Sequence, residues 1–331
     1  MSRARRPSAV RPPSTYLEFE RPLAAIDAEI AALAARRARR QAAGRLRALR
    51  AARRRLERDL VRDLTPWQRV QLARHPDRPS TLDYVRRLCT QFVELHGDRR
   101  FGDDGAVVGG LARFAGRAVV IVGHQRGRTP AERIARNFGM ARPEGYRKAV
   151  RLFELAARFR RPVLTFVDTQ GAYPGIGAEE RGQAEAIAAC LTALGDLGVP
   201  VVSALIGEGG SGGALALAVA DRVVMQEHAW YSVISPEGCA SILFRRLTPA
   251  TVARSAALLR LTAEDLLAAK VVDDVVAEPG GAAHRDPAGA AATLGRALER
   301  HLNTLVRRPA RALVAHRYAR YRRFAVDLPP V

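Results

Sequence analysis

Cysteine is scarce in this 331-residue chain, and the three cysteines, Cys89, Cys190 and Cys239, lie far apart in the sequence. No Cys-x-x-Cys spacing and no neighbouring histidine pair accompanies them, which disfavours both a zinc site and a disulfide framework. We expect all three to be small buried side chains. No other cluster of metal-ligating residue types rises above background, so we predict no metal site in this chain.

Long apolar runs are missing as well. The sequence has no segment of transmembrane length, and no apolar signal-peptide segment follows the basic residues 1–6. These absences disfavour a membrane protein and a secreted one, and they predict a cytoplasmic location. Because 48% of the residues are hydrophobic, the chain can bury a full core as one large domain with an appendage, or as two smaller domains.

Lysine is almost absent, since Lys148 and Lys270 are the only two, and arginine supplies nearly all of the formal net charge of +21. Residues 1–62 hold 17 arginines against 6 acids, and residues 296–331 hold 9 against 2. The segment between them is nearly neutral. Basic ends suit a nucleic acid or an acidic protein partner. A compositional bias toward arginine and alanine is the simpler explanation of these basic ends, and both interpretations stay open.

The predicted elements divide the chain into four parts. Residues 1–15 form a disordered leader, and residues 16–80 hold two amphipathic helices joined near Gly44 and a connector. Residues 81–295 form the main domain, which begins with a helix from Thr81 to Leu95 capped by Thr81. Residues 296–331 form a basic C-terminal helical segment.

Strands and helices alternate in the main domain. Two β-type runs, 106–114 and 117–123, predict a hairpin, and a helix over 146–159 follows. Strand 162–167, helix 183–197, strand 199–206 and a further helix predict parallel strands wound right-handedly, with short strands over 222–226, 230–234 and 271–276. Ligands of such sheets bind at the C-terminal strand ends, so the glycine-rich turns 168–182 and 207–213 should both lie at that edge of the sheet.

The turn at residues 207–213 contains five glycines and leads into a helix. Glycine lets a ligand approach the backbone, and a helix N-terminus offers unpaired N–H donors to a phosphate or an oxyanion. No Gly-Lys-Ser/Thr closes the turn, so it is not a phosphate loop of the P-loop type. The alternative is a tight packing turn without a ligand.

A hydrolytic triad is a second alternative, because Ser211, His228 and Asp168 supply its residue types. These types recur by chance in chains of this size, and sequence alone cannot test their geometry. No pair of carboxylates stands out as an acid–base couple. Catalysis by positioned backbone donors is therefore the hypothesis that remains.

Nine motifs make the chain resemble one family. They are YLEFE at 16–20, WQ at 67–68, QLARHP at 71–76, TLDY at 81–84, NFGM at 137–140, PEGYRK at 143–148, DTQGAYPGIGAEERG at 168–182, GEGGSGGALA at 207–216 and SPEG at 235–238. On these motifs, which run from about Tyr16 to about His284, the chain resembles the α subunits of the bacterial acetyl-CoA carboxylase carboxyltransferase.

The resemblance implies an α/β fold of the crotonase-like (ClpP/crotonase) type, a spiral of ββα units, with additional helices at both ends. It implies transfer of a carboxyl group from carboxybiotin to acetyl-CoA, giving malonyl-CoA in the first committed step of fatty acid synthesis. The implied partners are a carboxyltransferase β subunit in an α2β2 assembly, the biotin carboxyl carrier protein and biotin carboxylase. Biotin is the implied cofactor, and zinc is implied only in the β subunit.

The same resemblance assigns a site. The backbone N–H groups of Gly212 and Gly213 would form an oxyanion hole for the ureido oxygen of biotin, and Ser211 would be a turn residue. The residues implied to line the same cavity are Gly171, Ala172, Tyr173, Gly209 and Gly210. We expect a valine at position 213 to obstruct the ligand side of the turn and to leave the fold largely intact.

Departures from the family pattern qualify this assignment. Gln170 replaces an expected proline or lysine, and Arg126 replaces a common lysine. Residues 244–253, with Leu-Thr-Pro at 247–249, put a helix near the rim of the site in doubt. Two alternatives remain: a paralogous subunit that serves another acyl-CoA, and a nucleic-acid-binding protein built on a retired enzyme scaffold.

Overall fold

The computed structural model describes residues 15–35 and 40–324, and an eight-stranded sheet organises them. The strand order is β1-β2-β3-β4-β5-β6-β8, with β7 paired to β5. The first three strands are antiparallel and all later pairings are parallel. The strands are β1 (Cys89–Glu94), β2 (Val107–Phe114), β3 (Arg117–His124), β4 (Val163–Thr169), β5 (Val201–Gly210), β6 (Arg222–Gln226), β7 (Trp230–Ser232) and β8 (Asp274–Val276).

Fourteen α-helices accompany the sheet in the described part of the chain. They are α1 (Arg21–Ala35), α2 (Arg40–Arg62), α3 (Pro66–Ala73), α4 (Thr81–Leu88), α5 (Pro130–Ala135), α6 (Pro143–Phe159), α7 (Ile176–Glu180), α8 (Gln183–Gly195), α9 (Ser211–Ala218), α10 (Pro236–Phe244), α11 (Pro249–Leu258), α12 (Ala263–Ala268), α13 (Pro287–Leu305) and α14 (Ala310–Arg323). None of these helices is both long and apolar enough to cross a membrane.

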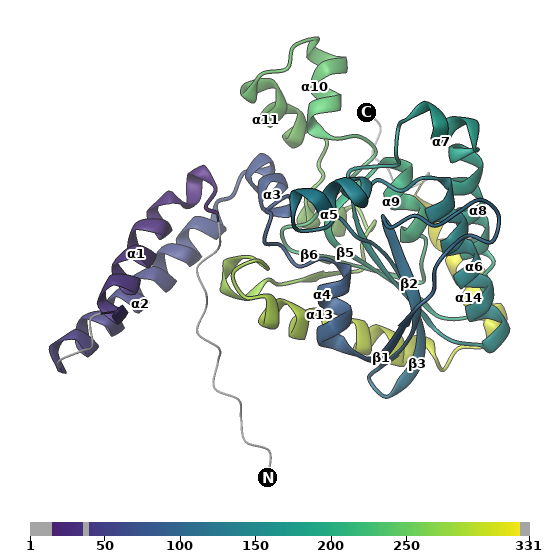
Figure 1. Ribbon diagram of the computed structural model, residues 1–331, viewed down its shortest axis with the longest axis horizontal. Helices are drawn as coiled ribbons and strands as arrows, with labels where there is room; N and C mark the ends of the chain where they lie inside the picture. The colour runs from purple at the N-terminus through teal and green to yellow at the C-terminus, as the bar shows by residue number, and fades with distance from the viewer. Residues whose placement is uncertain (1–14, 36–39, 325–331) are drawn as a thin grey trace.

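Helices cover both faces of the sheet, with α6, α8 and α9 on one face and α4 and α13 on the other (Figure 1). The side chains of β3 alternate accordingly. Val120 and Val122 belong to the hydrophobic core beneath α6, α8 and α9, and Val119 and Ile121 belong to the core beneath α4 and α13. Every residue of β4 and β5 is buried. Parallel strands covered on both faces read as continuous apolar runs, which is how these two strands were identifiable in the sequence.

The predicted hairpin is confirmed as β2 and β3. Its two turn residues, Ala115 and Gly116, both have positive φ (46° and 78°), as a two-residue type I′ turn requires. The predicted helices over 146–159 and 183–197 are confirmed as α6 and α8, although α6 begins at Pro143. The short helix α7 within the turn over 168–182 was not predicted.

The N-terminal helical pair is confirmed, but the predicted junction near Gly44 is wrong. Gly44 lies inside α2, and a Cβ there would meet nothing within 4 Å. A glycine in an exposed helix costs only about 1 kcal/mol, which the flanking alanines and leucines offset. The two helices form a hairpin that projects from the body (Figure 1), held by the Arg53–Asp27 ion pair at 2.5 Å.

The predicted helix from Thr81 to Leu95 is only half right. Helix α4 ends at Leu88, and the next six residues form the edge strand β1. The N-cap is Ser80, whose backbone N–H and hydroxyl both bond to the Asp83 carboxylate. Pairing with β2 decides the conformation of residues 89–94, and a periodicity argument along one segment does not contain that information.

The basic C-terminal segment contains a structural arginine. Arg317 of α14 is fully buried and binds Asp221 at 2.8 Å and the Leu197 carbonyl at 2.9 Å. Part of the positive charge therefore stabilises the fold and is not offered to a partner. The predicted leader lies, apart from residue 15, outside the described residues, and our domain boundaries stay a prediction.

Candidate active site at the glycine turns

The glycine stretch is not a loop. Strand β5 continues to Gly210, and α9 begins at the next residue, Ser211, whose φ is +54°. Gly210 is the N-cap and no side chain caps the helix. By contrast, Thr65, Thr129, Ser235, Thr248 and Thr262 cap α3, α5, α10, α11 and α12 with their hydroxyls.

The uncapped end leaves backbone donors free. The first N–H groups of a helix have no acceptor within it. Among the backbone and side-chain hydrogen bonds of the described residues outside regular helix and strand pairing, none uses the N–H of Gly212 or Gly213. Gly212 is half-buried, and a Cβ on it would meet only Ile187, at 3.7 Å. This arrangement combines free donors with the positive end of a helix and an open approach.

Both glycine turns lie at the same edge of the sheet, as predicted, and the second packs directly against the first. Thr169 of β4 pairs with Gly209 of β5. A Cβ on Gly213 would lie 2.5 Å from the Ala172 nitrogen and 2.6 Å from the Gly171 carbonyl carbon. Such distances are not compatible with any side chain, so position 213 must be glycine for the two turns to touch.

This contact corrects our expectation for a substitution at Gly213. We expected an added side chain to point toward the ligand and to spare the fold. Its Cβ instead meets the backbone of the neighbouring turn, and it would also come within 2.8 Å of the Tyr146 hydroxyl. A substitution there would displace residues 171–172, because backbone atoms cannot move aside as a flexible side chain can.

Gly209 and Gly210 are buried, and packing accounts for both glycines. A Cβ on Gly210 would lie 1.9 Å from the Gln170 carbonyl oxygen, and one on Gly209 would lie 2.8 Å from the ring of Tyr231. Gln170, one of the departures from the family pattern, therefore contributes its backbone at this point. Contact of Gly209 and Gly210 with a cofactor stays a prediction.

Two buried polar side chains beside the turns were not among the predicted site residues. The Tyr146 hydroxyl has no hydrogen-bond partner among the described residues, and the His124 ring lies against the backbone of Gly213 and Phe166. Burial lowers the pKa of His124 to about 3, so its imidazole is neutral at pH 7. Tyr146 lies in the PEGYRK motif, which was the available signal, but only the fold shows that its hydroxyl comes close to Gly213.

The position of residues 171–173 depends on Ala141. The Ala141 carbonyl accepts from the Tyr173 N–H at 2.9 Å and from the Gln183 side chain at 2.8 Å. The guanidinium of Arg142 stacks over the Tyr173 ring, 4.8 Å from its centroid. The turn that precedes α6 thus holds the loop that touches Gly213.

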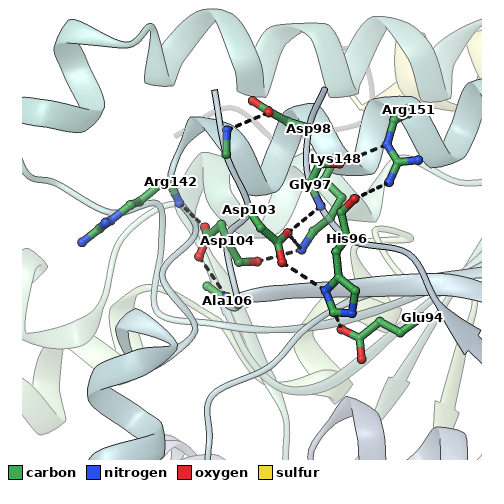
Figure 2. A network of polar contacts seen from close by, with 12 residues as sticks. Glu94, His96, Gly97, Asp98, Asp103, Asp104, Ala106, Arg142, Lys148 and Arg151 are labelled. Carbon is green, nitrogen blue, oxygen red and sulfur yellow. Dashed lines mark hydrogen bonds and ion pairs between the residues drawn. The ribbon is translucent and has the colours of Figure 1, made fainter. Parts of the chain in front are cut away.

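A polar network anchors that turn and the start of α6 (Figure 2). The Asp104 carboxylate accepts from the backbone N–H groups of Arg142, at 2.7 Å, and Ala106, at 2.9 Å. The buried Lys148 ammonium binds the Asp103 carboxylate at 2.6 Å and the Asp104 carbonyl at 2.8 Å. Because Tyr146 and Lys148 share α6, the network also fixes the position of the Tyr146 hydroxyl.

A ladder of alternating charges lies at the same ends of β4 and β5. Arg126 Nη1 is 3.1 Å from both Asp168 and Glu208, and Arg74 binds Glu208 at 2.6 Å and Glu237 at 2.5 Å. Burial alone would raise the pKa of Glu237, but the hydrogen bond and the charge of Arg74, together with bonds to the Glu237 backbone and Ser235, lower it overall. All three carboxylates are ion-paired, which leaves no free general base in the ladder. Arginine at position 126 suits this role, because one guanidinium reaches two carboxylates.

The triad alternative finds no support in this geometry. Ser211 is exposed, whereas His228 is fully buried and its backbone N–H binds Glu278 at 3.0 Å. The Asp168 carboxylate accepts from the Glu208 N–H, at 3.0 Å, and from Arg126. No contact of the described residues joins these side chains as nucleophile, base and orienting acid.

One group of potential metal ligands, Glu20, His75 and His284, occurs elsewhere among the described residues. The two imidazole rings stack face to face, 3.7 Å apart and only 9° from parallel. Nitrogen lone pairs lie in the plane of each ring, so two nearly parallel rings cannot both point at one ion. His75 already accepts from the Asp77 N–H and contacts the Thr15 carbonyl. The cluster instead fastens the segment before α1 to the body.

The altered segment over residues 244–253 retains a helix. Thr248 caps α11, and its hydroxyl accepts from the Thr251 N–H at 3.2 Å. Helices α10 and α11 form a hairpin that projects from the body (Figure 1). Three of its large apolar side chains, Ile242, Leu243 and Leu247, are 68%, 60% and 64% exposed.

Comparisons with known proteins agree with this geometry. Residues 16–325 match the family described as acetyl co-enzyme A carboxylase carboxyltransferase-like. The chain is 56% identical over 267 residues to the acetyl-coenzyme A carboxylase carboxyl transferase subunit alpha of Heliobacterium modesticaldum, covering 81% of this chain and 79% of that protein. It is 53% identical over 316 residues to the same subunit of Xanthomonas campestris pv. campestris, covering 93% and 97%.

Two solved structures share the fold. A Pseudomonas malonate decarboxylase hetero-tetramer in complex with coenzyme A gives a TM-score of 0.58 at 18% identity, covering 75% of this chain and 98% of that one. Transcarboxylase 12S gives 0.54 at 24% identity, covering 69% and 42%. These likenesses confirm the predicted crotonase-like α/β fold.

Proposed function

This chain belongs to the carboxyltransferase α-subunit family of acetyl-CoA carboxylase, and on that premise we propose that its two glycine turns hold biotin during carboxyl transfer to acetyl-CoA. The product of the proposed reaction is malonyl-CoA. The observation that carries the proposal is the uncapped start of α9: outside regular helix and strand pairing, no hydrogen bond of the described residues uses the N–H groups of Gly212 and Gly213.

The residues present fit biotin. A cyclic urea carries no full charge, so it needs directed hydrogen-bond donors and a surface without a Cβ in the way. Gly212 is open on its outer side, and the buried Tyr146 hydroxyl next to Gly213 is unpartnered. A buried hydroxyl without a partner is costly, and a ligand oxygen would relieve that cost.

Carboxybiotin, attached to its carrier protein, supplies the carboxyl group and, after losing it, a base for the acetyl methyl group. The backbone N–H groups of Gly212 and Gly213 would hold the ureido oxygen of a bound biotin by donating to it, and would stabilise negative charge on that oxygen during carboxyl transfer. One such donor is typically worth about 3 kcal/mol in the transition state. The α9 N-terminus adds its partial positive charge at the same place.

In this proposal Gly171, Ala172 and Tyr173 would line the biotin site beside Gly213 and would exclude water from it. The carboxylates of Asp168 and Glu208 stay paired with Arg126. Pairing keeps them from competing for the N–H donors or for a proton. This chain therefore contributes donors and shape to the reaction, and it contributes no acid–base side chain.

A partner subunit completes the site in this proposal. The exposed side chains Ile242, Leu243 and Leu247 on the α10–α11 hairpin form an apolar surface of the kind that marks protein–protein contacts. We assign this surface to the carboxyltransferase β subunit, which would bring zinc and most contacts to acetyl-CoA into an α2β2 assembly. Biotin carboxyl carrier protein and biotin carboxylase would be further partners of that assembly.

The test is reconstitution of the chain with a β subunit. Malonyl-CoA formation from carboxylated carrier protein and acetyl-CoA supports the proposal, and failure of a folded, assembled complex to form it refutes the proposal. Propionyl-CoA assayed side by side distinguishes the acetyl-CoA enzyme from a paralogue that serves another acyl-CoA. A higher kcat/KM for acetyl-CoA is the expected result.

A further inference from the structure

A cavity of about 650 Å³ lies at the edge of the sheet opposite the glycine turns. It opens beside Arg222, the first residue of β6, and beside the segment that leads from α12 into β8. The last turn of α14 closes its other side. The cavity is therefore at the N-terminal ends of the parallel strands, whereas both glycine turns follow C-terminal strand ends.

The lining of this cavity is strongly cationic. It contains Arg222, Arg260, Lys270, Arg320 and Arg323, and its one carboxylate belongs to Asp273. That carboxylate is already committed, because it binds Arg320 at 2.6 Å and the Val223 N–H at 2.7 Å, and Arg222 lies 3.6 Å away. Among the lining side chains, five permanent cations against one acid leave a net charge of +4, and Asp265, which is outside the lining, pairs with Arg260 at 3.7 Å.

Structural roles account for only some of these cations. Arg320 donates to the Val271 carbonyl and Arg323 donates to Ala319, so both help to satisfy backbone carbonyls. Lys270, in contrast, has no side-chain hydrogen bond or ion pair within the described chain. The Nε atom of the buried Arg320 and the Nδ1 atom of His316 also lack partners there. Lys270 is therefore the one lining cation without an acceptor in the described part of the chain.

The pKa of His316 reflects the positive electrostatic potential around the cavity. Burial lowers its pKa, and the positive charges of Arg222, Arg308 and Arg320 lower it further, against a smaller opposite effect from Asp221. Like charges held together in this way repel one another unless an anion neutralises them. Guanidinium groups are especially suited to phosphate oxygens, which they can bind in a bidentate manner.

We propose that this cavity binds a small molecule that carries a diphosphate group. Two phosphates in line match several separated cations better than one carboxylate does, and their charge offsets most of the net +4. The site is independent of the proposed carboxyl transfer, because it lies at the other edge of the sheet. Its occupant would be a ligand that regulates or stabilises the subunit and is not a reactant.

Titration of the full-length chain with inorganic pyrophosphate tests the proposal by calorimetry at low ionic strength. The variant Lys270→Gln/Arg323→Gln removes two exposed cations and should weaken binding at least tenfold. The matched variant Arg86→Gln/Arg87→Gln removes two exposed cations from α4 and should leave affinity unchanged. The imidazole signals of His316 should shift on binding, with a raised pKa in the complex.

ADP and adenosine extend the same experiment. Equal binding of ADP and pyrophosphate means that the diphosphate suffices, and tighter binding of ADP identifies a nucleotide as the occupant. If adenosine binds and pyrophosphate does not, the proposal is contradicted. The absence of pyrophosphate and ADP binding, or equal affinity in both double variants, would overturn it as well.

Discussion

Replacing Gly213 with alanine tests the contact between the two glycine turns. The added Cβ would lie 2.5 Å from the Ala172 nitrogen and 2.6 Å from the Gly171 carbonyl carbon. Ordinary contact begins near 3.4 Å, so one turn must retreat by about 1 Å. Overpacking of this kind costs about 1–3 kcal/mol of stability. A misplacement of about 1 Å in a reacting site can reduce the rate about 100-fold.

We expect kcat of the reconstituted α–β complex to fall about 100-fold in Gly213→Ala, because the N–H donors lose their alignment. The KM for acetyl-CoA should change little, since the β subunit holds the acceptor in our proposal. Gly44→Ala is the matched control: its Cβ meets nothing, and it should raise the free energy of unfolding by up to about 1 kcal/mol without changing kcat. Full activity of Gly213→Ala would refute the reasoning.

Further predictions concern other parts of the molecule. Tyr146→Phe should leave thermal stability unchanged or raise it, since the hydroxyl has no partner among the described residues, and should lower kcat about tenfold; an unchanged kcat would remove the hydroxyl from the site. Asp104→Asn weakens two backbone contacts and should cost about 1–3 kcal/mol in denaturant unfolding, whereas an unaltered midpoint would contradict the anchoring role. Glutamates in place of Ile242 and Leu243 should abolish β-subunit binding in sedimentation without lowering the melting temperature, and unimpaired binding would place the interface elsewhere. Burial and the neighbouring His284 lower the pKa of His75 to about 4 in the folded protein. As the pH falls below 6.5, His75 is therefore protonated in the unfolded chain before it is protonated in the folded protein. The free energy of unfolding should thus be highest above pH 6.5 and should fall by about 3 kcal/mol between pH 6.5 and pH 4. His75→Gln should flatten that part of the stability curve, and an unchanged slope would show that His75 does not contribute.

The elements that could be predicted from sequence share one property: their conformation is set by their own residues. The β2–β3 hairpin follows from Ala115 and Gly116, and the buried strands β4 and β5 follow from continuous apolar runs. Errors arose where another segment decides. Residues 89–94 became β1 because β2 offers hydrogen bonds to them. The error at Gly44 had a local cause instead, because its strongly helical flanks outweigh the cost of one glycine.

The candidate site shows the same division. The glycines at 212 and 213 stand out in the sequence, and the parallel strand order placed both turns at one edge of the sheet. Sequence did not show that Gly213 touches Ala172, because that contact joins turns about 40 residues apart. It also gave no reason to place the Tyr146 hydroxyl beside them, since only the packing of α6 against β3 and α8 brings that side chain to the site.

The most direct measurement is a structure of the α–β complex with biotin bound. Our account predicts that the ureido oxygen lies about 2.7–3.1 Å from the backbone nitrogens of Gly212 and Gly213, the range for an oxyanion hole. A biotin whose ureido oxygen lies beyond hydrogen-bonding distance of both nitrogens, with the α9 N-terminus unused, would contradict it.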